Sequence, residues 1–149
     1  MIVKEIYHSH GIKNREDLDI DNVAAAFNIP LFKNFPLDIR VKSKEIDIIM
    51  LQANDIYTMT ETFFHELAHV LRHGHTHIND SYRKYCEGQA NKLMYELAIP
   101  DFMITNEIVD YKSLSTYFNV SESFALKRIE LLKINNNFKG LDYYDDEAI

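Results

Sequence analysis

The stretch FFHELAHVLRHGH, residues 63–75, gathers side chains that can do chemistry. His65 and His69 stand four residues apart, and Glu66 directly follows the first of them. On an α-helix this spacing puts both imidazoles one turn apart on one face, where they can bind one Zn²⁺ at about 2.0–2.1 Å. Glu66 projects at a different angle, so it can reach a water on the metal without binding the metal. The HExxH pattern therefore predicts two zinc ligands and a general base on one helix.

The helical pattern of residues 56–73 supports this interpretation over its alternative, a surface cluster of histidines beside a solvated glutamate. One side of such a helix is apolar, as a core-facing side should be, and carries Met59, Phe63, Leu67, Val70 and Leu71. The opposite side carries the polar residues Thr62, His65, Glu66, His69 and His73. The candidate ligands thus face away from the predicted core.

A catalytic zinc site needs a third protein ligand and one open position. His75 has the spacing of the metzincin pattern HExxHxxGxxH, but that pattern requires glycine where this chain has Arg72. Glu87 is the preferred candidate, because a long loop can bring its helix antiparallel across the HExxH helix. The small side chain of Ala90 would allow a close approach of the two helices. Asn91, one turn after Glu87, could orient a ligand imidazole through a hydrogen bond.

The remaining elements form an α+β pattern, with strands first and helices after them. A helix is expected from Asp21, as N-cap, to about Asn28, before Pro30. Short strands are expected within 31–52, with EIDIIML as a central or well-covered strand. Helices are expected over 55–72, 81–98, 105–118 and 121–134, with Ser121 as N-cap of the last, whereas residues 1–15 show no clear period. We predict one domain over 1–134 and an acidic, flexible tail over 135–149.

The charge and the amino-acid composition argue against some classes of function. The net charge is −7, with 16 basic and 23 acidic residues, which argues against direct nucleic-acid binding. No apolar run approaches the roughly 20 residues that span a bilayer. The N-terminus lacks the apolar stretch of a signal peptide, and the single cysteine, Cys86, cannot form an intrachain disulfide. These features lead us to expect a cytoplasmic protein.

The second motif makes the chain resemble a known family. HELAH, followed by E-x-x-A-N and L-x-x-P (Glu87, Ala90, Asn91, Leu97 and Pro100), resembles the ImmA/IrrE family of zinc-dependent metallo-endopeptidases. Leu93 and Met94 stand where that family usually has Phe-Ala. The resemblance covers roughly residues 19–133.

The resemblance has several implications for the site and the fold. It implies a gluzincin-like site with one zinc per chain, held by His65, His69 and Glu87, and with Glu66 as general base. It implies a zincin-like fold: a small N-terminal sheet, the HExxH helix, an antiparallel helix with the glutamate, and a C-terminal helical hairpin. It also implies a protein substrate, namely a helix-turn-helix repressor of a phage or mobile element.

Several assignments stay open at this stage. The donor that stabilises the oxyanion is expected between residues 73 and 85, with His73, His77 and Tyr85 as the main candidates and His75 and Tyr82 as others. Cys86 is read as a packing residue rather than a fourth ligand. The hairpin LSTYFNVSESFALKRIELL is read as a packing unit rather than a DNA-binding one. Zn²⁺ and Mn²⁺ are not distinguished.

An alternative function is a zinc-stabilised binding module, such as an antirepressor or toxin–antitoxin partner, that acts by sequestration. Glu66 argues against this alternative, because a module that only binds has no need of a base at that position.

Overall fold

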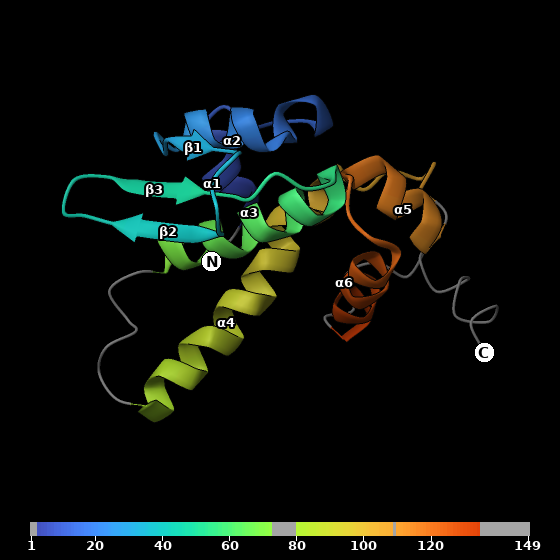
Figure 1. Ribbon diagram of the computed structural model, residues 1–149. Helices are drawn as coiled ribbons and strands as arrows, with labels where there is room; N and C mark the ends of the chain where they lie inside the picture. Colours follow the sequence, from blue (N-terminus) through green and yellow to red (C-terminus); the bar gives the residue numbers. More distant parts are fainter. Residues whose placement is uncertain (1–2, 73–79, 109, 135–149) are drawn as a thin grey trace.

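The computed structural model describes residues 3–72, 80–108 and 110–134, and for residues 80–88 it describes the backbone alone. These residues form a small sheet and a larger set of helices (Figure 1). In chain order the elements are α1 (Val3–Ser9), the 3-10 helix η1 (Arg15–Leu18), α2 (Ile20–Ala26), β1 (Leu31–Phe32), β2 (Ile39–Lys42), β3 (Asp47–Met50), α3 (Ile56–Leu71), α4 (Asp80–Ala98), η2 (Asp101–Met103), α5 (Tyr111–Phe118) and α6 (Glu122–Ile134). The class is α+β, as predicted.

The sheet has the strand order β1-β3-β2. β3 pairs in parallel with β1 and antiparallel with β2, so EIDIIML supplies the central strand, as predicted. Ile49 of β3 is fully buried, whereas Ile39 and Val41 of β2 are 37% and 38% exposed. Because successive residues of a strand point to opposite faces, the inner face joins the core and the outer face is open.

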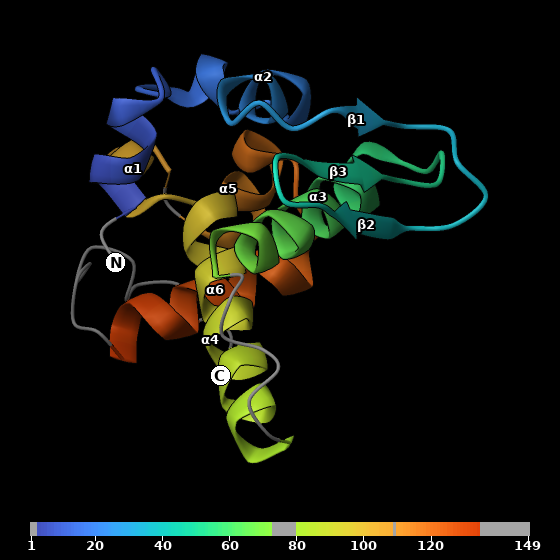
Figure 2. The same cartoon turned by 90° about the vertical axis from the view of Figure 1, so that its left-hand side faces the viewer.

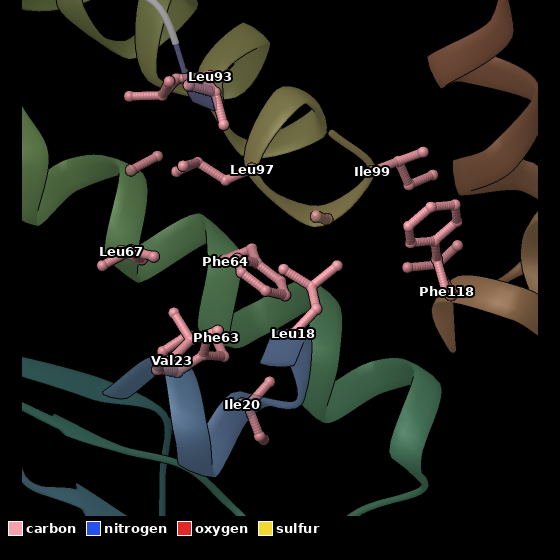
Figure 3. Close-up of a cluster of buried hydrophobic side chains, with 14 of the residues drawn as sticks. Leu18, Ile20, Val23, Phe63, Phe64, Leu67, Leu93, Leu97, Ile99 and Phe118 are labelled. Atoms are coloured by element: carbon pink, nitrogen blue, oxygen red, sulfur yellow. The ribbon is translucent and has the colours of Figure 1, made fainter. Parts of the chain in front are cut away.

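The core lies where α3 crosses α4. Phe63, Phe64 and Leu67 of α3 are buried, as are Leu93 and Leu97 of α4. Figure 3 shows these side chains in one cluster with residues of η1, α2 and α5, and Phe63 lies beside Val23 of α2. The second view shows the sheet beside α3 and the long α4 extending away from it (Figure 2). Packing against α4 and the N-terminal helices therefore fixes how α3 is turned about its axis.

Side chains from the two ends of the chain tie down the end of α4. The Tyr7 hydroxyl of α1 donates a hydrogen bond to the carbonyl of Leu97 at 2.6 Å, and the Nε of Arg128 in α6 donates to the carbonyl of Ile99 at 2.9 Å. The last carbonyls of a helix have no partner within it, so these bonds satisfy groups that would otherwise be buried unpaired. Burial raises the pKa of Tyr7 well above its usual value and lowers the pKa of Arg128 to about 10.

The α5–α6 hairpin is closed by short-range capping. Asp110 accepts a hydrogen bond from the backbone N–H of Ser113 at the start of α5, and Asn119 ends that helix in the left-handed conformation with φ 57°. Ser121 caps α6 as predicted, since its Oγ accepts from the N–H of Phe124 at 3.2 Å. The Ser121 N–H in turn donates to Oε2 of Glu61 at 2.7 Å, which ties the hairpin to α3.

One helix was not predicted, and two expectations were wrong. Residues 3–9 form a helix, α1, whose buried residues Val3 and Tyr7 are one turn apart, too short a repeat to stand out in the sequence. Asp19, not Asp21, caps α2, because its side chain accepts from the N–H groups of Asp21 and Asn22. α5 begins at Tyr111 rather than 105, because Asp110 is extended and acts as its cap. The expected acidic tail lies outside the described residues.

Within the described residues, none of the helices combines the length and the apolar character that crossing a membrane requires.

Candidate functional site

The candidate site lies on the polar side of α3. Asp55 caps the start of this helix, because its side chain accepts a hydrogen bond from the N–H of Thr58 at 2.8 Å. That hydrogen bond is the main cause of the lowered pKa of Asp55. The opposite side of the helix is buried and includes Phe63, Phe64 and Leu67. With that side buried, His65, Glu66 and His69 are left half-buried at the surface of α3. The packing thus presents the HExxH side chains as the sequence predicted.

The two histidines lie next to each other. Their ring centroids are 4.8 Å apart and the ring planes are inclined at 76°. Neutral imidazoles one helical turn apart are a common pair of zinc ligands, and a half-buried pair keeps access to a third ligand and to water. His65 and His69 therefore fit a metal centre as two of its ligands.

Glu66 faces the sheet. Its Oε1 lies 3.2 Å from Nη1 of Arg40 on β2 and accepts a hydrogen bond from it. The side chain of Glu66 is 17% exposed and that of Arg40 is 28% exposed. A charged hydrogen bond therefore ties one oxygen of the Glu66 carboxylate to the edge strand.

The candidates for a third ligand lie in parts of the chain whose side chains are not described. His73, His75 and His77 lie outside the described residues, and Tyr82, Tyr85, Cys86 and Glu87 lie on the part of α4 described by backbone alone. Among the side chains that are described, no three of His, Cys, Asp or Glu are grouped to hold a metal. Position 87 is on α4 one turn before Ala90, which is buried, as the close approach of the helices requires. Asn91 is exposed, and its role stays a prediction.

The comparison with protein families decides the relationship. Residues 24–130 match the peptidase family described as the IrrE N-terminal-like domain. This chain belongs to that family. The IrrE N-terminal-like match includes α3, α4, α5 and the part of α6 up to residue 130, so the HExxH helix and position 87 both fall within it.

One relative is a protein of a phage-like element. The chain is 28% identical over 150 residues to the phage-like element PBSX protein XkdA of Bacillus subtilis (strain 168), over 88% of this chain and 71% of that protein. No solved structure matches the chain.

The sequence pattern missed Arg40, although a signal for it existed. Arg40 stands between Ile39 and Val41 in a strand, so it had to face opposite to both of them. What the sequence could not supply was which face meets α3. The DNA-binding interpretation of the hairpin also loses support, because Arg128, one of the three basic residues of its second helix, is 3% exposed and bonds to the protein backbone.

Proposed function

We propose that this protein is a zinc-dependent endopeptidase with a zincin-like fold, and that its substrate is a helix-turn-helix repressor of a phage or mobile element. One observation carries the proposal: in a chain of a peptidase family, His65, His69 and Glu66 stand half-buried on one side of a helix whose other side is fixed by the core. The similarity to a phage-like element protein supports the substrate class. The proposed site of action is the cytoplasm.

The proposed ligands are His65, His69 and Glu87. When bound, zinc lowers the pKa of a water molecule and polarises the scissile carbonyl. Glu66 accepts the proton of the attacking water as the water oxygen bonds to the carbonyl carbon. Glu66 then gives that proton to the amine as the C–N bond breaks. Asn91 would orient a ligand imidazole, and His73, His77 or Tyr85 would donate a hydrogen bond to the oxyanion.

Metal content tests the ligand set. We expect one zinc per purified wild-type chain, lost in His65→Ala and in Glu87→Ala and retained in His75→Ala, by elemental mass spectrometry. If His75→Ala loses zinc and Glu87→Ala retains it, the third ligand is His75 and not Glu87. Absence of zinc from wild-type protein, even after zinc is added, would refute the metal site.

Cleavage tests the enzyme against the binding module. Wild-type protein and Glu66→Gln, both loaded with zinc, are incubated with purified helix-turn-helix repressors encoded in the same element, and fragments are identified by mass spectrometry. We expect cleavage by wild type and none by Glu66→Gln. Glu130→Gln makes the same chemical change on the exposed side of α6 and should cleave normally. A repressor that is bound equally by both proteins and cut by neither would favour sequestration.

A further inference from the structure

Arg40 contacts Glu66, the proposed general base, but has no part in the proposed function so far. Its strand, β2, is an edge strand that pairs with β3 alone. Arg40 stands directly opposite Ile49, which is fully buried, and residues opposite each other on paired strands share a face of the sheet. Arg40 therefore projects from the edge of the sheet toward α3.

The Arg40–Glu66 contact differs from an ordinary surface ion pair. The Lys33–Asp21 pair shows the ordinary kind, with side chains 45% and 58% exposed. Such solvated pairs contribute little. Arg40 and Glu66 are only 28% and 17% exposed, and they are joined by a charge-assisted hydrogen bond of 3.2 Å. Reduced solvent access makes that bond stronger and more directional.

Arg40 bonds to only one of the two carboxylate oxygens of Glu66. Oε1 of Glu66 accepts from Arg40, and within the described part of the chain Oε2 has no hydrogen-bond partner. A glutamate side chain has several rotatable bonds, and a base works only when it is held within reach of its proton.

We propose that Arg40 is a positioning residue for Glu66: it holds Oε1 from the edge strand, so that Oε2 is kept in place to take the proton of the attacking water. This rests on the proposed function, since it assigns Arg40 a part in that same reaction. Arg40 acts through Glu66 and need not touch the substrate. The substrate class and the zinc ligands do not depend on it.

Kinetics of three variants test the role of Arg40, on the repressor that wild-type protein cleaves. Arg40→Gln should lower kcat at least tenfold, change KM less than about threefold and retain one zinc per chain. Arg40→Lys keeps a charged donor and should recover part of kcat. Lys42→Gln is the matched control: it removes the same charge from an exposed position two residues along the strand and should match wild type.

Three kinetic outcomes would overturn the role. A kcat within twofold of wild type in Arg40→Gln means that Glu66 is positioned without Arg40. A raised KM with unchanged kcat makes Arg40 a substrate-binding residue. Loss of zinc from Arg40→Gln makes Arg40 a support of the metal site.

A measurement on zinc-free protein separates this inference from the proposed function. Thermal unfolding is compared for Arg40→Gln, Glu66→Gln and the double variant. If the two side chains interact as described, the shifts in Tm of the single variants do not add up to that of the double variant. Additive shifts would overturn the contact itself. Non-additive shifts in a protein that cleaves none of the repressors would refute the proposed function, and the positioning role with it, and would leave the pair as a structural one.

Discussion

Replacing Tyr7 with phenylalanine removes one hydroxyl from the core and leaves the aromatic ring in place. That hydroxyl is the hydrogen-bond donor to the carbonyl of Leu97, at 2.6 Å, and both residues are fully buried. A buried hydrogen bond contributes about 1 kcal/mol, and a buried carbonyl left without a partner raises the loss further. We therefore expect the free energy of unfolding to fall by about 1–2 kcal/mol. For a protein of this length the Tm should fall by about 5 °C.

The same hydroxyl gives a pH dependence whose sign can be worked out. Burial raises the pKa of Tyr7 in the folded state, whereas the unfolded chain has a tyrosine pKa of about 10. The contribution of a neutral Tyr7 is therefore fully present below about pH 10 and is lost as the pH rises above that value. The loss approaches about 1.4 kcal/mol per pH unit. The stability difference between wild type and Tyr7→Phe should thus shrink above pH 10.

Urea unfolding followed by circular dichroism, at pH 7 and at steps above pH 10, measures both effects. Tyr57→Phe is the matched control, because Tyr57 is 43% exposed, and it should stay within about 0.5 kcal/mol of wild type. If Tyr7→Phe is as stable as Tyr57→Phe at pH 7, the hydroxyl does not cap α4. If wild type and Tyr7→Phe lose the same amount of stability above pH 10, Tyr7 is not buried as described.

Four further predictions concern caps and metal. Arg128→Met should lower the free energy of unfolding, measured with urea, by about 1–2 kcal/mol, because the Ile99 carbonyl loses its charged donor. Lys127→Met, on the exposed side of α6, is the control and should be close to neutral. Asp110→Ala should cost about 1 kcal/mol in the same assay, because it removes the cap of α5. Hydrogen bonding to the backbone of Ser113 lowers the pKa of Asp110, so the stability that this cap contributes should vanish as the pH falls through that pKa. Asn119→Ala should cost about 1 kcal/mol because of its left-handed backbone, whereas Asn119→Gly should be nearly neutral. Zinc at 100 times its dissociation constant should stabilise wild type by about 2.7 kcal/mol in a thermal scan and leave His65→Ala unchanged, with chelator reversing the gain.

Long periodic elements were predictable and short ones were not. The α3 and α4 boundaries fall within one residue of expectation, because each helix repeats its apolar side over several turns. α1 has only two turns and two buried residues, so it offered no period to recognise. The choice between Asp19 and Asp21 as cap depends on which carboxylate reaches free N–H groups, and composition does not encode that.

Part of the candidate site could also be predicted from the sequence, and part could not. The positions of His65, Glu66 and His69 on one side of α3 follow from helical geometry alone. The Arg40–Glu66 contact joins residues 26 apart in sequence and depends on the packing of a sheet against a helix. Local patterns carry no information on such a contact.

The bonds at the end of α4 also set an order of events during synthesis. Tyr7 and its acceptor at Leu97 are 90 residues apart, and Ile99 waits another 29 residues for Arg128. A ribosome that adds about 5–20 residues per second makes Leu97 roughly 5–20 s after Tyr7. Throughout that interval the Tyr7 hydroxyl has been made but its acceptor has not. Nascent chains arrested before residue 128 should therefore remain open to protease at α4, and those arrested well beyond it should become resistant.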